Sequence, residues 1–148
     1  MTSDPSTWWT SGELATIGDT GEIDLATRRR DGTLRRARIV WVVRLGDGIY
    51  VRSVNGAEAA WYRGVQTRHQ GHLTAGPVDR DITFVEAGVH AHGAATQDSG
   101  LDDALDAEYQ AKYGRSPSAV ARITSATARA TTLRLDPAGA APNAAEIT

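Results

Sequence analysis

The stretch from residue 38 to residue 63 constrains the fold of this chain more than any other, because its hydrophobic pattern and its turn residues agree. Residues 39–43 form an unbroken apolar run, which favours a strand covered on both faces. Gly46, Asp47 and Gly48 follow, and glycines on both sides of an aspartate supply the positive φ of a tight hairpin. Residues 49–54 are therefore predicted to fold back antiparallel on the first strand.

A short helix is predicted next, at residues 57–65. Asn55 can cap this helix with its side-chain oxygen, and Glu58 can reach back to the Asn55 amide as in a capping box. The preceding strand ends at Arg52 and Ser53, so a guanidinium and a hydroxyl are expected beside the free amides of the helix start. This combination predicts an anion-binding cradle.

The composition is that of an ordinary globular protein, with 41% hydrophobic and 23% charged residues in a chain of 148. We expect one domain at residues 8–136, with loose tails at residues 1–7 and 137–148. The absence of cysteine excludes disulfides, thiolate metal sites and a cysteine nucleophile. The sequence has no signal-like segment and no apolar stretch of membrane-spanning length, so the expected location is the cytoplasm, with no membrane partner.

Hydrophobic alternation and turn residues predict six short strands. They fall at residues 23–27, 35–43, 49–54, 69–75, 80–86 and 130–135. Helices are expected at residues 11–17, where Ser11 would be the cap, at 57–65, at 101–113, and after Ser116. Strands joined in hairpins, with helices inserted after the third and fifth, favour a small antiparallel barrel of the α+β class.

Several sequence blocks within residues 8–136 carry a resemblance to a known family. They are WTSGEL, DGTLRR, WVVRLGDGIYVRSVNG, AAWYR, AEYQAKYG and TTLRL. On these blocks the chain resembles the bacterial domain-of-unknown-function 2255 family, within the FMN-binding split-barrel superfamily. It is more distantly similar to the pyridoxamine-phosphate oxidases and the deazaflavin-dependent nitroreductases. The resemblance implies an α+β fold, a small antiparallel six-stranded split β-barrel with short flanking helices, and by analogy a homodimer.

The likeness to the nitroreductases rests on residues 53–62, SVNGAEAAWY. It implies that FMN or a deazaflavin coenzyme binds there and is held by Arg52, Ser53, Asn55, Trp61, Tyr62 and Arg63. The chain would then be an oxidoreductase acting on a small organic substrate, with the cofactor supplying the chemistry. Glu58 stands in the first turn of the predicted helix, where its carboxylate would compete with a phosphate for the same amides. The alternative is a cofactor-free split-barrel protein that binds or converts a small acidic or aromatic ligand.

The predicted cofactor contacts also allow structural roles. Arg52 and Arg63 are either a phosphate clamp or solvated charges on a strand and a helix. Trp61 and Tyr62 either stack on a ligand or pack in the barrel.

Three residues of the helix predicted at 101–113 are the candidate catalytic residues, namely Tyr109, Lys112 and Tyr113. They lie within about one helical turn and can meet on one face. A phenol beside an ammonium is suited to donate a proton, because the cation favours the phenolate. The two tyrosines also extend the apolar stripe of the helix, so packing is the alternative role.

Two further clusters of residues, one of arginines and one of histidines, give only weak signals of a functional site. Six arginines crowd one predicted hairpin, at positions 28, 29, 30, 35, 36 and 38, and they could follow a nucleic-acid backbone. No aromatic residue interleaves with them there, so a solvated or dimer-edge face is favoured and no nucleic-acid partner is expected. His90 and His92 place two imidazoles on one side of an extended chain, but no third ligand has a recognisable spacing, and no metal site is predicted.

Overall fold

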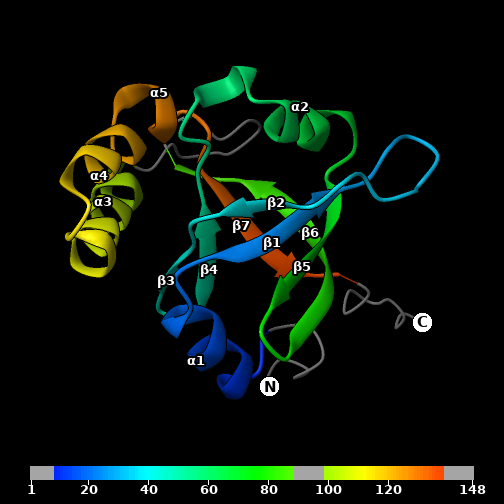
Figure 1. Ribbon diagram of the computed structural model, residues 1–148, viewed down its shortest axis with the longest axis horizontal. Helices are drawn as coiled ribbons and strands as arrows, with labels where there is room; N and C mark the ends of the chain where they lie inside the picture. Colours follow the sequence, from blue (N-terminus) through cyan, green and yellow to red (C-terminus); the bar gives the residue numbers. More distant parts are fainter. Residues whose placement is uncertain (1–8, 89–98, 139–148) are drawn as a thin grey trace.

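The computed structural model describes residues 9–88 and 99–138, which form an α+β fold (Figure 1). In chain order the elements are α1 (Ser11–Asp19), β1 (Ile23–Thr27), β2 (Arg38–Val40), β3 (Val43–Leu45), β4 (Gly48–Val51), the 3₁₀ helix η2 (Gly56–Glu58), α2 (Ala60–Thr67), β5 (Gln70–Ala75), β6 (Val78–Glu86), α3 (Ser99–Tyr113), α4 (Pro117–Ile123), α5 (Ala126–Arg129) and β7 (Leu133–Pro137). Helices α1 and α2 lie at opposite ends of the sheet, and α3, α4 and α5 gather beside it (Figure 1). Every helix in these described segments is too short or too polar to cross a bilayer.

The strands form one antiparallel sheet in the order β2-β1-β5-β6-β7-β4-β3. Its two edge strands, β2 and β3, are neighbours in the chain and are separated only by Trp41 and Val42. The sheet must therefore curl until its edges come close enough for two residues to bridge them. The predicted α+β class and antiparallel pairing are confirmed, whereas the expected six-stranded barrel is a curled half-barrel of seven strands.

The seventh strand arises because the apolar run at residues 39–43 is broken and not continuous. Ile39 pairs with β1 on one edge and is 66% exposed, whereas Val43 pairs with β4 on the other edge and is buried. The prediction of one strand covered on both faces is therefore wrong. The run passes from one sheet edge, where Ile39 is exposed, through the interior at Val42 to the other edge.

Two hydrophobic clusters lie on the two faces of the sheet. The larger one fills the inside of the curl, where alternate residues of β4, β5, β6 and β7 point inward as strand periodicity requires. The smaller one joins β3 to the helices α3, α4 and α5 through Val43, Leu105, Tyr109, Ile123 and Ala128. The helices beside the sheet are thus held by a core of their own.

Several predicted boundaries need correction. Thr10, and not Ser11, caps α1, because the Thr10 hydroxyl accepts from the Glu13 amide and the Glu13 carboxylate accepts from the Thr10 amide. The helix predicted at residues 57–65 is divided into η2 and α2, because Ala59 between them is extended, with φ of −61° and ψ of 138°. The short α5 was not predicted. Pro137, expected in a loose tail, ends β7 opposite Ile82.

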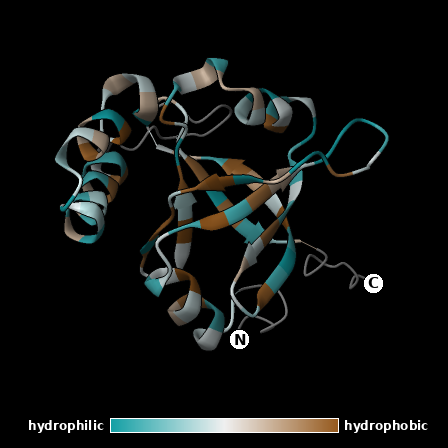
Figure 2. Cartoon of the chain, in the orientation of Figure 1, coloured by the Kyte–Doolittle hydropathy of each residue, from teal (hydrophilic) through white to brown (hydrophobic). Residues whose placement is uncertain are grey.

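The segment between β1 and β2, residues 28–37, carries most of the clustered arginines. It extends outward from the sheet (Figure 1) and is hydrophilic over most of its length (Figure 2). Asp31 organises its turn, because its carboxylate accepts from both the amide and the hydroxyl of Thr33. The predicted hairpin is confirmed in its pairing, since β1 and β2 are antiparallel neighbours.

Candidate functional site: an aromatic cleft at the sheet edges

A cleft of about 440 Å³ opens where the β2 edge of the sheet and Trp41, beside the break to β3, meet the end of β4, α2 and α4. We call it the aromatic cleft. It is lined by Glu22, Arg38, Ile39, Val40, Trp41, Arg52, Val54, Asn55, Trp61, Ala119, Arg122 and Ile123. This volume and this mixture of apolar walls with a few polar groups are typical of small-molecule sites.

The two tryptophans of the aromatic cleft are held by other aromatic rings. Trp41 stacks on Tyr113 with ring centroids 3.9 Å apart and planes 4° from parallel. Trp61 meets Tyr62 edge to face, with centroids 6.2 Å apart and an interplanar angle of 85°. Both tryptophans are only partly buried, so each keeps some ring surface toward the cleft. Flat, preorganised aromatic surface suits a planar ligand.

The polar groups of the cleft favour an anion. Arg38 and Arg122 are exposed, and the Arg122 Nη2 atom donates to the Asn55 Oδ1 atom at 2.9 Å. Neither arginine forms a salt bridge within the described residues. Glu22 is the one carboxylate among the described lining residues. Two arginines against one carboxylate leave the cleft cationic.

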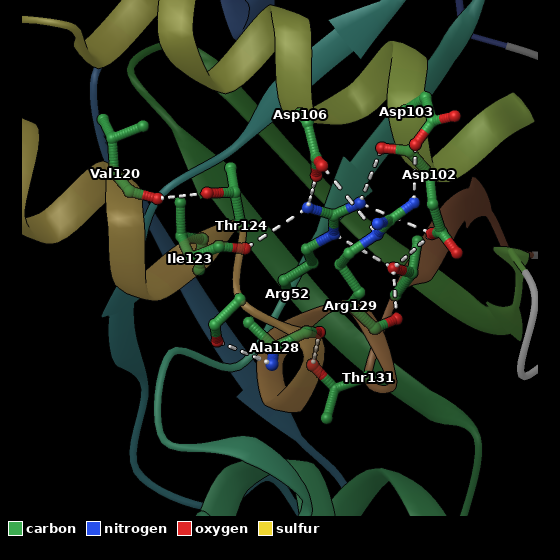
Figure 3. Close-up of polar contacts among 12 residues, drawn as sticks. Arg52, Asp102, Asp103, Asp106, Val120, Ile123, Thr124, Ala128, Arg129 and Thr131 are labelled. Atoms are coloured by element: carbon green, nitrogen blue, oxygen red, sulfur yellow. Dashed lines mark hydrogen bonds and ion pairs between the residues drawn. The ribbon is translucent and has the colours of Figure 1, made fainter. Parts of the chain in front are cut away.

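Arg52 borders the same cleft, but its guanidinium is turned into the protein (Figure 3). It is 2% exposed and donates from Nη1 to Asp106 Oδ1 at 2.6 Å and to the Ile123 carbonyl at 3.2 Å. Nη2 donates to the Asp102 carbonyl at 3.1 Å, and Nε donates to the Thr132 hydroxyl at 3.0 Å. These contacts link the residue after β4 to α3, to α4 and to the residue before β7. An anion in the cleft would have to displace them to reach this guanidinium.

The other predicted cofactor residues are divided between the cleft and the core. Asn55 and Trp61 line the cleft, although Asn55 makes no capping hydrogen bond and Glu58 lies in η2 outside the lining. Ser53 and Tyr62 are buried and do not line it. Arg63 lines another cleft, together with Arg35 and residues of α2, and not the aromatic cleft. The predicted cradle of Arg52, Ser53 and helix amides is therefore not assembled as one site.

The candidate catalytic residues of α3 lie behind Trp41 and outside the cleft. The Lys112 Nζ atom donates to the Val42 carbonyl at 2.7 Å, and the Tyr113 hydroxyl accepts from the Val42 amide at 3.1 Å. Tyr109 is fully buried in the smaller cluster. These contacts hold the break between β2 and β3.

The acid–base properties of these residues also differ from the expectation. Burial raises the pKa of Tyr109 above its ordinary value of 10.0, and burial raises the pKa of Tyr113 to about 12. Burial lowers the pKa of Lys112 from 10.5 to about 8, against a smaller opposing effect of Asp19. Desolvation is the largest cause of all three shifts, and it disfavours the phenolate and the ammonium that the predicted proton donor requires.

The cleft residues that sequence reasoning missed are Arg38, Trp41 and Arg122. Arg38 and Trp41 were assigned to a continuous buried strand, and Arg122 comes from a helix 67 residues beyond its partner Asn55. The one signal in the sequence is the position of Arg38 directly before the apolar run, because a charged residue there is more typical of an exposed edge strand than of a strand buried on both faces.

Within residues 9–88 and 99–138 the histidines are His69 and His72, and neither lines the aromatic cleft. His72 Nδ1 is 2.8 Å from Asp81 Oδ1, and the other ring nitrogen contacts Asp79. Across residues 9–88 and 99–138, no group of three or more metal-ligating side chains is assembled. His90 and His92 lie outside the described residues.

The curled antiparallel sheet, with its flanking helices and a ligand-sized cleft where its edges meet, defines a protein of the split-barrel class. The chain belongs to the family described as "Uncharacterized protein conserved in bacteria (DUF2255)", whose model matches residues 13–135. A search of curated proteins finds no match.

Solved structures share this fold at low sequence identity. The heme storage protein HutZ from Vibrio cholerae superposes with a TM-score of 0.56 and 14% identity, covering 86% of this chain and 89% of its own. The conserved hypothetical protein Rv2991 from Mycobacterium tuberculosis gives 0.50 and 9%, covering 92% and 84%. An FMN-binding protein from Syntrophomonas wolfei gives 0.48 and 11%, covering 84% and 78%.

Proposed function

We propose that this protein binds a planar, anionic small molecule in the aromatic cleft, and that this molecule is a flavin or deazaflavin with which the chain acts as an oxidoreductase on a small organic substrate. The observation that carries the proposal is the joint placement, around one cleft of about 440 Å³, of two tryptophans held by other rings and two arginines that form no salt bridge within the described residues. Rings would contact Trp41 and Trp61, and a phosphate would be recognised by guanidinium forks.

The lining residues fit such a cofactor in both of its parts. Ile39, Val40 and Val54 supply apolar contact for a ring system between the tryptophans. Arg38 and Arg122 are exposed and carry no carboxylate partner in the described chain, so their donors are available to an anionic group. Arg52 would hold the end of β4 against α3 and so stabilise the cleft, and it would not be a phosphate ligand.

A flavin fits this cleft better than a heme does. HutZ, which shares the fold, is described as a heme storage protein. Heme iron is held by an axial His, Cys, Met or Tyr side chain. None of these residue types is among the described residues that line the aromatic cleft.

The chemistry of the proposed enzyme would come from the cofactor, which supplies hydride or electron transfer when it is bound. The residues of this chain would bind and orient the ring and exclude water from one of its faces. The alternative is a cofactor-free protein that binds a small aromatic acid in the same cleft, since the same tryptophans and arginines recognise both classes of ligand.

Titration with riboflavin, FMN and benzoate tests the proposal. We expect FMN to bind more tightly than riboflavin and to quench tryptophan fluorescence. Trp61→Ala should weaken both flavins, whereas Arg122→Gln should weaken FMN by about tenfold to a hundredfold and leave riboflavin unchanged, as a hydrogen bond to a charged group requires.

Arg115→Gln is the matched control, because Arg115 is exposed and lies outside the cleft. It should bind FMN as the wild type does. Benzoate binding without flavin binding would support the cofactor-free alternative. Failure of all three ligands to bind would remove the proposal.

A further inference from the structure

Two more clefts continue from the aromatic cleft and are lined by arginine. The first, of about 250 Å³, shares Arg38 and Trp61 with the aromatic cleft. The second, of about 470 Å³, shares Arg35 and Ala60 with the first. We call these two the arginine clefts. The three clefts therefore lie in series, from β2 past the segment before it to α2.

Five arginines line the arginine clefts, namely Arg29, Arg35, Arg36, Arg38 and Arg63. No carboxylate stands among their described lining residues, which otherwise are apolar or neutral. Other arginines of the chain are paired with acids: Arg28 with Asp81 at 2.8 Å, Arg80 with Glu13 at 3.1 Å, Arg129 with Asp103 at 2.8 Å and Arg134 with Asp136 at 2.9 Å. None of the five cleft arginines forms a salt bridge within residues 9–88 and 99–138. Asp31 offsets part of their charge, since its pKa is lowered by hydrogen bonds from Thr33 and, to a smaller extent, by Arg29. Most of the positive charge of the arginine clefts is therefore left uncompensated by the described part of the chain.

Two of these guanidinium groups are fixed by neutral oxygens. The Arg35 Nη1 atom donates to the Arg28 carbonyl at 2.8 Å, and the Arg29 Nη1 atom donates to the Leu34 carbonyl at 3.1 Å. Gly64 of α2 allows Arg35 to cross the helix, because a Cβ atom at Gly64 would lie 3.1 Å from Arg35 Nη1 and 2.6 Å from the Thr27 hydroxyl oxygen. A glycine inside a helix costs about 1 kcal/mol relative to alanine, so this approach is built at the expense of helix stability.

We propose that the arginine clefts bind a diphosphate or similar polyanionic group, so that the natural ligand is an extended molecule of the dinucleotide class with its ring in the aromatic cleft and its polyanion over Arg36, Arg38 and Arg63. This inference rests on the proposed function for the position of the ring, but not for the anion site itself. Guanidinium groups bind phosphate oxygens in pairs, and several phosphate oxygens can engage several forks at once. The concave, small volumes favour a compact polyanion over a nucleic-acid strand, which needs a longer track.

Arg36 and Arg63 are the residues to change, because both side chains are exposed and neither guanidinium donates a hydrogen bond to another described residue. The wild-type chain should bind inorganic pyrophosphate more tightly than inorganic phosphate, with an affinity that falls as salt is raised. Arg36→Gln and Arg63→Gln should each weaken pyrophosphate by about tenfold or more. Arg30→Gln removes the same charge from the loop that carries Arg36, but Arg30 lines none of the three clefts, and this variant should bind pyrophosphate as the wild type does.

Flavin ligands separate the two proposals. If both hold, flavin adenine dinucleotide should bind at least tenfold more tightly than FMN, and Arg63→Gln should remove this difference while FMN binding stays unchanged. Equal affinity for FMN and the dinucleotide overturns the extended ligand but leaves the proposed function intact. Pyrophosphate binding that depends on Arg36 and Arg63, without any flavin binding, supports the anion site while the proposed function fails.

Absence of pyrophosphate binding, or equal binding by wild type and variants, overturns the anion site. A single-stranded RNA oligonucleotide serves as the competing probe. If it binds far more tightly than pyrophosphate with the same dependence on Arg36 and Arg63, the small-ligand proposal is overturned in favour of nucleic acid.

Discussion

Arg52 shows how one side chain can look like a ligand residue in the sequence and act as a structural residue in the fold. A guanidinium is costly to bury unless it is paired and hydrogen-bonded. Here two carboxylates, two carbonyls and a hydroxyl satisfy it (Figure 3). The nearby Tyr109 ring, 5.4 Å from the guanidinium carbon, adds a cation–π contact. The network therefore specifies how α3 docks against β4.

The first prediction is that Arg52→Ala lowers the free energy of unfolding by about 3–5 kcal/mol, because Asp102 would be left buried without its cation. Urea denaturation measures it. Arg115→Ala, which removes an exposed arginine, should change stability by less than about 0.5 kcal/mol. A loss below about 1 kcal/mol in Arg52→Ala would contradict the buried network.

Gly71 is a second residue at which the fold depends on one position. A Cβ atom there would lie 2.8 Å from the Phe84 ring and would collide with the Ala26 carbonyl of the neighbouring strand. The position is buried in the middle of the sheet, between β1 and β6. Only glycine leaves room for this approach.

The second prediction is that Gly71→Ala destabilises the fold by about 1–3 kcal/mol, as overpacking of a core does. Thermal denaturation of the variant beside the wild type tests it. Gly12→Ala is the control, because a Cβ atom there meets nothing closer than 4.0 Å and the site lies in the first turn of α1. A neutral Gly71→Ala would mean that β1 and β6 can separate without cost.

At the scale of elements, the break between β2 and β3 is the feature that makes the half-barrel. Val42 lies between the strands, so its amide and carbonyl have no strand partner in the described sheet. Tyr113 and Lys112 of α3 take that place, and the Tyr113 ring also supports Trp41. Helix α3 therefore supplies hydrogen-bond partners to the Val42 backbone and also supports Trp41, which lines the aromatic cleft.

The third prediction is that Tyr113→Phe lowers the free energy of unfolding by about 1–3 kcal/mol, because the buried Val42 amide loses its acceptor. The stack on Trp41 should survive, since phenylalanine keeps the ring. Chemical denaturation gives the loss, and near-ultraviolet circular dichroism reports the tryptophan environment. Wild-type stability in this variant would show that water or another group replaces the hydroxyl.

The elements that the sequence predicts well are those with their own periodicity. β5 and β6 alternate buried and exposed residues around a glycine turn, and α3 carries an apolar stripe. The predicted ranges of these three elements are therefore close to the observed ones. The run at residues 39–43 was misread because a strand buried on both faces and a chain crossing between two edges are equally apolar. α5 has four residues, too few for a helical period to appear.

The candidate site was harder to predict than the fold. Its walls come from β2, the end of β4, α2 and α4, and only the curl of the sheet brings these together. Asn55 and Trp61 were found because they belong to one local stretch. Arg122 was missed because nothing in its own segment marks it, and its neighbour across the cleft is 67 residues away.

At the scale of the whole molecule, the stability of the fold is linked to pH through groups that burial has shifted. Lys112 is the clearest, with its pKa lowered by burial to about 8. Above this pH the folded protein has lost that proton, while the unfolded chain keeps it up to about 10.5. Tyr109 and Tyr113 act in the opposite sense, because burial raises their pKa values above the ordinary 10.0.

The fourth prediction follows from these signs. Between about pH 8 and pH 10 the unfolded chain binds more protons than the folded chain at Lys112, so the free energy of unfolding should rise with pH. Above about pH 10 the unfolded tyrosines ionise first, and stability should fall. Lys112→Met should remove the rise and keep the fall. Urea denaturation at several pH values between 7.5 and 11 measures both slopes. The pKa of His72 is also shifted, because burial lowers it but Asp81 and Asp79 raise it by more. His72 is present in both proteins, so its contribution cancels in the difference between them. A parallel pH dependence in the two proteins would show that Lys112 keeps its proton in the folded state.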